Sequence, residues 1–186
     1  MRLLLFPGID TTRSAIGIAL WHRATHAADC RRLAAAPGLI QTAVEEFLRA
    51  YVPVVTARDV AKETTIDSCH LKQGGIVTLP LGAANRDPEV LRRPDDVLSH
   101  CADSRRAAFG LGVRRRIGSR KARPETATAL REWLRAIPEF SLAPNAAATW
   151  SAGIARGPRT LPLTVAFPRT AAPEAESFEH PVTAEI

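Results

Sequence analysis

The stretch Phe109–Gly118, FGLGVRRRIG, decides the fold of this chain. Its glycines, Gly110, Gly112 and Gly118, give the backbone conformations that other residues avoid and let it approach a ligand closely. Three consecutive arginines, Arg114 to Arg116, add permanent positive charge. Glycine-rich stretches also occur in turns and in phosphate-binding sites, so this stretch alone fixes no function. Its meaning depends on the motifs that surround it.

Near the start of the chain, Gly8-Ile9-Asp10-Thr11 precedes an apolar run that predicts a helix from about Thr11 to Thr25. Pro7 favours a helix start after it, because an interior proline costs about 3 kcal/mol. Asp10 and Thr11 can therefore be a plain helix N-cap, since their side-chain oxygens accept hydrogen bonds from free amides at a helix start.

Two more helices are expected before residue 51. Ala27–Ala35 is short, and Leu39–Ala50 follows the break at Pro37-Gly38. On the second helix Glu46 and Arg49 lie three residues apart, so they share one face and can form an ion pair.

β-branched residues then predict three strands, Val52–Val60, Thr65–His70 and Gly75–Leu81. A last helix is expected from Pro124 to about Ile137, with a frayed turn before Pro124. From Ala166 onward, prolines and weak periodicity predict a loose tail.

The order of these motifs resembles that of the cytochrome P450 family. Gly8–Thr11 resembles its [AG]-G-x-[DE]-T distal helix, Glu46 and Arg49 its E-x-x-R helix, and Phe109–Gly118 its F-G-x-G-x-[RH]-x-C-x-G heme loop. The segment before that loop, GAANRDPEVLRRPDDV (82–97), and the terminal β-hairpin, Thr149-Trp150 with residues 156–162, resemble family segments too. The resemblance covers about residues 3 to 164. It implies a mainly α fold with small β-sheets (α+β), the C-terminal half of the cytochrome P450 fold.

The resemblance also implies a chemistry. The family binds heme, inserts an oxygen atom from O₂ into an organic substrate, and takes electrons from a redox partner such as ferredoxin. Carried over residue by residue, it gives Asp10 and Thr11 as a proton relay and Glu46 with Arg49 as a structural ion pair. Heme contacts would come from Arg58, Phe109, Gly112 and Arg114.

The axial cysteine of the family is missing. Arg116 stands at that position, and a guanidinium is always protonated, has no free lone pair and cannot replace a thiolate on iron. No metal ligand is therefore assigned. Asp96 stands where many members have an arginine against the Glu46–Arg49 pair, so that triad is incomplete. We expect the monooxygenase activity to be absent.

Length and composition limit the alternatives. The chain has 186 residues, less than half the length of a typical family member, and Met1 falls just before the distal motif; we expect a partial domain, residues 1–164, and a tail, 165–186. No apolar run approaches the roughly 18 residues of a membrane span, and no signal-peptide core is present. The three cysteines show no disulfide or metal spacing, which indicates free thiols in the cytoplasm.

Charge and histidines point to no other site. The net charge of +6 is scattered outside Arg114–Arg116, and a single tyrosine argues against a nucleic-acid partner. His22 and His26, at i and i+4, lack the glutamate of an H-E-x-x-H motif and are expected on a helix surface.

Three functional hypotheses remain open. The first is a diverged heme-thiolate monooxygenase relative that has lost activity. The second is a noncatalytic protein, either a pseudoenzyme fragment that binds a partner or a gene remnant. The third is a nucleic-acid-binding module, which the composition disfavours.

Overall fold

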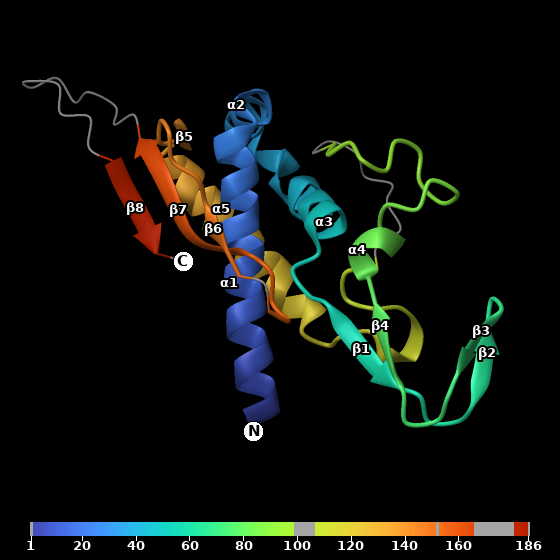
Figure 1. The fold of residues 1–186 in the computed structure, drawn as a ribbon. Helices are drawn as coiled ribbons and strands as arrows, with labels where there is room; N and C mark the ends of the chain where they lie inside the picture. Colours follow the sequence, from blue (N-terminus) through green and yellow to red (C-terminus); the bar gives the residue numbers. More distant parts are fainter. Residues whose placement is uncertain (1, 99–106, 152, 166–180, 186) are drawn as a thin grey trace, which may run out of the picture.

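A computed structural model describes residues 2–98, 107–151, 153–165 and 181–185. It confirms a mainly α fold with small β-sheets. Figure 1 shows the long helix α1 (Arg2–Thr25) crossing the middle of the molecule, with α3 (Ile40–Tyr51) on one side and the strands of the C-terminal sheet on the other. The remaining helical elements are α2 (Ala27–Ala35), α4 (Leu81–Ala84), α5 (Ser119–Ala136), and the 3-10 turns η1 (Pro37–Leu39) and η2 (Gly112–Arg114).

Helix α1 begins earlier than the sequence predicts. It starts at Arg2 and continues through Pro7, so Asp10 and Thr11 lie inside the helix and not at its N-terminus. The N-cap interpretation of these two residues is therefore wrong. Pro7 has no amide hydrogen for the carbonyl of Leu3, a loss that the rest of a helix of 24 residues outweighs.

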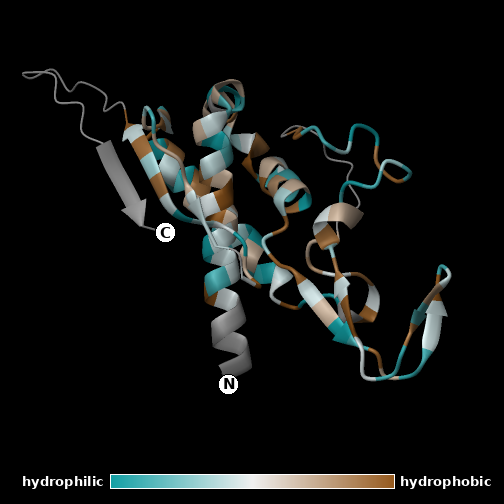
Figure 2. Cartoon of the chain, viewed as in Figure 1, coloured by the Kyte–Doolittle hydropathy of each residue, from teal (hydrophilic) through white to brown (hydrophobic). Residues whose placement is uncertain are grey.

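Helix α3 is amphipathic and carries much of the core. Its apolar residues Val44, Phe47 and Leu48 are buried against α1 and α5. Figure 2 shows apolar residues along these helices and mostly hydrophilic ones in the loop after α4. The predicted bounds of α2 are confirmed, and those of α3 differ by one residue at each end. No helix in the described part of the chain is long and apolar enough to cross a membrane.

The middle strands form two small antiparallel pairs. β1 (Thr56–Asp59) pairs with β4 (Ile76–Leu79), and β2 (Thr64–Ile66) pairs with β3 (Cys69–Leu71). The prediction of one strand over Thr65–His70 is wrong, because Asp67 and Ser68 have φ angles of 44° and 65° and turn the chain between β2 and β3. This hairpin projects away from the helices (Figure 1).

The last sheet contains β5 (Phe140–Leu142), β6 (Thr149–Trp150), β7 (Pro158–Val165) and β8 (Pro181–Glu185), all paired antiparallel to β7. The predicted hairpin between Thr149-Trp150 and residues 156–162 is confirmed. The predicted loose tail is wrong at β8, which pairs along β7; residues 166–180 lie outside the described residues.

Helix α5 begins at Ser119 and not at Pro124. The predicted frayed turn is helical, and Pro124 lies inside the helix. Thr126, Ala127 and Leu130 are buried, and contacts with α1 and α3 hold this face of the helix. Tertiary packing therefore offsets the proline, and the glycine-rich loop leads directly into an ordered helix.

Candidate functional site

The glycine-rich loop folds back on itself between residue 107 and α5. Gly110 and Gly112 have φ angles of 79° and 63°, in the left-handed region that favours glycine. The amide of Gly110 donates to the carbonyl of Ala107 at 2.7 Å, and that of Arg116 donates to the carbonyl of Phe109 at 2.9 Å. The loop is thus a closed turn, held by its own backbone hydrogen bonds.

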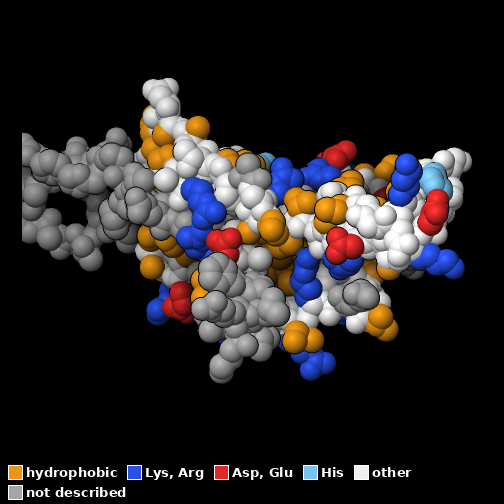
Figure 3. All heavy atoms as spheres, turned by 60° about the horizontal axis from the view of Figure 1, so that its bottom comes forward, with side chains coloured by type: hydrophobic (Ala, Val, Ile, Leu, Met, Phe, Trp, Pro, Cys, Tyr) orange, Lys and Arg blue, Asp and Glu red, His pale blue; other side chains and the backbone are white. Residues whose placement is uncertain are grey.

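A pocket of about 440 Å³ lies between this loop, α1, the end of α3, α5 and the segment before β7. Most of its lining is apolar, and its polar side chains come from α1 and from Arg116. Figure 3 views the molecule from the end at which α1 begins, and on this face hydrophobic side chains gather between Lys and Arg side chains. The pocket is lined by Asp10, Thr11, Thr12, Ala15, Leu48, Pro53, Val54, Ala108, Phe109, Arg116, Ala122, Ile154 and Ala155.

Arg116 is half-buried in this pocket. Its Nη1 donates to the carbonyl of Ala108 at 3.3 Å. Within the described ranges, Arg116 forms no ion pair with a carboxylate. Desolvation lowers the pKa of Arg116, and the charge of Arg58 lowers it further. The group is still protonated at physiological pH, because the ordinary pKa of a guanidinium is above 12.

Asp10 and Thr11 lie in the same pocket as Arg116, so the structure brings together the two polar motifs that the sequence singles out. The carboxylate of Asp10 accepts a hydrogen bond from Arg13 Nη2 at 2.9 Å, and Arg159 Nη1 lies 3.8 Å from it. Asp10 therefore already has cationic partners.

Phe109 lines the pocket, and the guanidinium of Arg123 packs on its ring. The Arg123 guanidinium carbon lies 4.7 Å from the centre of the Phe109 ring, and Arg123 Nε also pairs with Glu45 of α3. The sequence gives no sign of this arrangement, because its members lie far apart along the chain and follow no motif.

The other predicted heme contacts lie outside the pocket lining. Arg58 is exposed on β1 and donates to Thr56 Oγ1 at 2.9 Å and to the Ala57 carbonyl at 2.7 Å. Gly112 is exposed in η2, with no atom within 4 Å of a Cβ placed on it. Arg114 is in η2, and its side chain lies outside the described residues.

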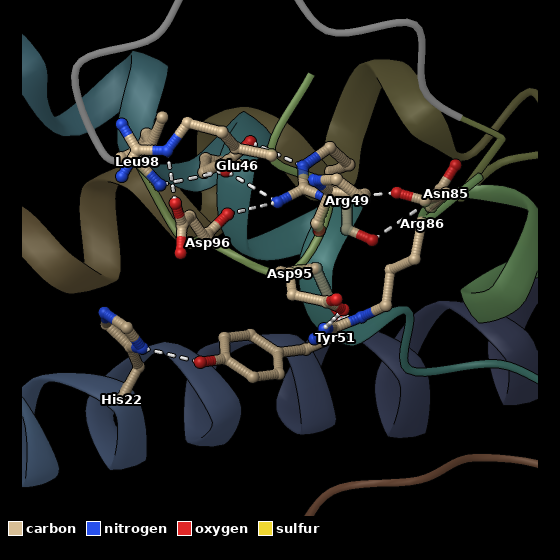
Figure 4. A network of polar contacts seen from close by, with 12 residues as sticks. His22, Glu46, Arg49, Tyr51, Asn85, Arg86, Asp95, Asp96 and Leu98 are labelled. Atoms are coloured by element: carbon tan, nitrogen blue, oxygen red, sulfur yellow. Dashed lines mark hydrogen bonds and ion pairs between the residues drawn. The ribbon is translucent and has the colours of Figure 1, made fainter. Parts of the chain in front are cut away.

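The predicted ion pair between Glu46 and Arg49 is confirmed and is part of a larger network (Figure 4). Arg49 Nε and Nη2 donate to the two carboxylate oxygens of Glu46, each at 2.8 Å. Arg49 also donates to the backbone carbonyls of Asn85, Pro94 and Asp96, at 2.7 to 2.9 Å. Arg49 thus holds the backbone of the segment before the glycine-rich loop against α3.

Asn85 connects this network to the glycine-rich loop. Its Nδ2 donates to the carbonyl of Arg49 at 3.1 Å, and its Oδ1 accepts from the amide of Ala107 at 2.6 Å. Asn85 is only 1% exposed, so both bonds form in the interior. The chain just before the loop is therefore tied to the last turn of α3.

The sequence predicts His22 on the surface, but in the structure it is buried. Its Nδ1 lies 2.7 Å from Tyr51 Oη and its Nε2 lies 3.1 Å from Asp29 Oδ2, while its ring stacks on His26 at 4.0 Å. Burial lowers the pKa of His22 and raises that of Tyr51. The Asp29 carboxylate can only accept, so the neutral ring carries its proton on Nε2. These three aromatic and acidic partners explain how α1 buries an imidazole.

The pocket does not fit the iron of a heme-thiolate protein. Among the described residues that line it, the groups with nitrogen or oxygen side-chain atoms are a carboxylate, two hydroxyls and a guanidinium, and none is a thiol, thioether or imidazole. The carboxylate of Asp10 is paired with Arg13, and the guanidinium of Arg116 cannot donate a lone pair. A fixed positive charge beside ferric iron is repulsive.

Comparison with known proteins gives consistent relationships. The sequence pattern of the family described as "Cytochrome P450" matches residues 38–146. The "Probable cytochrome P450 127A1" of Sinorhizobium fredii is 34% identical over 140 residues, which are 75% of this chain and 34% of that protein. The "Polyketide biosynthesis cytochrome P450 PksS" of Bacillus subtilis is 32% identical over 143 residues, 76% of this chain and 35% of that protein.

A solved structure agrees with these relationships. The crystal structure of cytochrome P450 CYP101C1 superposes with a TM-score of 0.82 at 36% identity, and covers 87% of this chain and 42% of that one. The chain spans about a third of the length of the curated relatives that it matches.

Proposed function

We propose, from the premise that this chain belongs to the cytochrome P450 family, that it has the family's heme-facing scaffold but performs no heme-thiolate oxygen chemistry. One observation carries the proposal: Arg116, at the position where the family loop has its cysteine, lines the pocket with a protonated guanidinium. The electron-rich sulfur that promotes O–O bond cleavage has no substitute among the described lining residues.

The remaining site residues are assigned by the same resemblance. We place Asp10 and Thr11 at the proton-delivery positions, and Arg58, Phe109, Gly112 and Arg114 at the heme-contact positions. Heme, where bound in the family, supplies the oxygen chemistry. In this chain Asp10 is held by Arg13 and lines the pocket, and without a thiolate there is no oxygen chemistry for its position to serve.

The proposal makes the chain a noncatalytic relative of bacterial monooxygenases. A ferredoxin-type redox partner is carried over from the family resemblance alone, and a cytoplasmic location rests on the spacing of the three cysteines. The gene-remnant hypothesis is different from this proposal. A remnant has no selected role, so that hypothesis predicts no ligand for the pocket.

Turnover with a supplied redox system tests the proposal. The chain is mixed with hemin, ferredoxin, ferredoxin reductase, NADPH and a general dealkylation substrate, ethoxycoumarin. We expect no product above that formed by free hemin. Product formation well above free hemin by the unmodified chain would show that another group replaces the thiolate.

Arg116→Cys separates the ligand from the rest of the site. We expect weak heme uptake and leakage of electrons to peroxide, with no gain in product, because oxygen chemistry also needs a dry pocket that positions the substrate and delivers protons in sequence. Arg115→Cys is the matched control, since it puts a thiol one residue away on an exposed side chain. A product yield from Arg116→Cys far above that of Arg115→Cys would mean that the cysteine is all the site lacks.

A further inference from the structure

Arg116 differs from the other arginines that hold this part of the fold. Arg49 is buried and donates two hydrogen bonds to the carboxylate of Glu46. Arg123 pairs with the carboxylate of Glu45. Arg116 is half-buried, yet in the part of the chain that the structure describes its hydrogen bond goes to a single carbonyl oxygen, that of Ala108. A guanidinium has five N–H donors, so most of its capacity is available in the pocket.

The surroundings of Arg116 favour an anion. The Asp10 carboxylate in the same pocket is already paired with Arg13 and lies 3.8 Å from Arg159. Arg58 adds a second positive charge, close enough to lower the pKa of Arg116. An anion bound at Arg116 would relieve this repulsion and replace the water that burial removes.

The rest of the pocket selects an apolar body. Its volume of about 440 Å³ is in the range of sites for small organic ligands, and most of its lining is aliphatic or aromatic. Leu48, Val54, Ala108 and Ile154 line it together with Arg116 and Phe109. A small hydrated anion such as phosphate would gain nothing from these side chains and would lose its water.

We propose that this pocket binds an amphipathic monocarboxylate, with the carboxylate on the guanidinium of Arg116 and the apolar chain or ring among Leu48, Val54 and Ile154. A planar guanidinium fork matches the two oxygens of a carboxylate. One bound carboxylate also matches the single charge that Arg116 places in the pocket. Carboxylate binding goes beyond the loss of oxygen chemistry. It depends on an anion bound at Arg116, whereas the loss of oxygen chemistry depends on the missing axial thiolate.

Calorimetric titration of the whole chain with decanoate tests the proposal. We expect saturable binding of one decanoate per chain. Decanol, which has the same apolar chain without the charge, should bind at least about tenfold more weakly, and inorganic phosphate should not bind. Equal binding of decanol would contradict recognition of the carboxylate by Arg116. Tight binding of phosphate would contradict selection of the ligand by the apolar lining. No saturable binding of decanoate would overturn the proposal as a whole.

Variants locate the site. Arg116→Gln should weaken decanoate binding about tenfold or more, whereas Arg115→Gln, which removes the same charge from an exposed neighbour, should change it less than about twofold. Ala155→Phe, which fills part of the pocket without removing the charge of Arg116, should weaken decanoate and decanol alike. Far-UV circular dichroism checks that each variant keeps its helices.

A second substitution at Arg116 keeps the test valid if Arg116→Gln unfolds. Arg116→Lys retains the charge and loses the planar fork. The affinity for decanoate should therefore be lower than that of the unmodified chain but still measurable. Unchanged binding in both Arg116→Lys and Ala155→Phe would place decanoate elsewhere and contradict the proposal. This result is independent of heme, because hemin is absent from the titration.

Discussion

Glu46 and Arg49 form a two-bond fork one turn apart on α3, with Nε–Oε2 and Nη2–Oε1 both at 2.8 Å and both side chains at most 4% exposed. Three backbone carbonyls and the amide of Leu98 complete the network. The pair therefore fixes the segment that leads to the glycine-rich loop.

Glu46→Gln should lower the free energy of unfolding by about 3–5 kcal/mol, because it leaves the Arg49 guanidinium buried without its counter-charge. Urea denaturation followed by circular dichroism measures the change. Glu132→Gln is the matched control: Glu132 and Arg135 have the same spacing on α5 but are 54% and 80% exposed. We expect less than about 1 kcal/mol there. Equal effects in the two variants would mean that the buried network contributes no more than a surface pair.

Gly157→Ala should destabilise the contact between the segment before β7 and α1. A Cβ on Gly157 would lie 2.7 Å from Ser14 Cβ and 2.9 Å from Ser14 Cα, and the Cα belongs to the helix backbone and cannot turn away. We expect a loss of about 1–3 kcal/mol in the free energy of unfolding, measured by thermal or urea denaturation.

Gly153→Ala is the control for that substitution, because a Cβ on Gly153 meets no atom within 4 Å. It should change the free energy of unfolding by less than about 0.5 kcal/mol. If Gly157→Ala proved as mild as Gly153→Ala, the close approach of Gly157 to Ser14 would not exist in solution.

His22 should make the stability depend on pH. Burial lowers its folded pKa below the ordinary value of 6.5, so below about pH 6.5 the unfolded chain takes up a proton that the folded chain does not. The contribution of neutral His22 is complete above pH 6.5 and is lost as the pH falls, by at most about 1.4 kcal/mol per pH unit. Urea denaturation between pH 7.5 and pH 5 measures this slope.

His22→Gln should reduce that slope, and His70→Gln should leave it nearly unchanged, since the side chain of His70 is 53% exposed. A slope that stays the same without His22 would show that other groups cause the acid sensitivity.

Much of the fold follows from local pattern. The bounds of α2 are correct because Pro37-Gly38 ends it, and the Thr149-Trp150 hairpin is correct because its resemblance to the family is specific. The predicted starts of α1 and α5 are wrong for one reason. Pro7 and Pro124 lower the local helix propensity, but each lies inside a long helix, and α5 also packs on α1 and α3.

The site was predictable only in part. The resemblance placed Asp10, Thr11, Phe109 and Arg116 together, and the pocket contains all four. The sequence gives no sign of Asn85, which holds the chain just before the loop, or of Arg123, which packs on Phe109, because their partners are far away in sequence. Buried His22 was missed for the same reason, since Tyr51 and Asp29 satisfy it from other elements.

The absorption spectrum of the reduced, carbon monoxide-bound chain after reconstitution with hemin tests the central claim most directly. Because Arg116 cannot ligate iron, we predict that the unmodified chain lacks the red-shifted Soret band of thiolate ligation. That band in the unmodified chain would contradict the account, because it would mean that a cysteine reaches the iron and that Arg116 does not occupy the axial position.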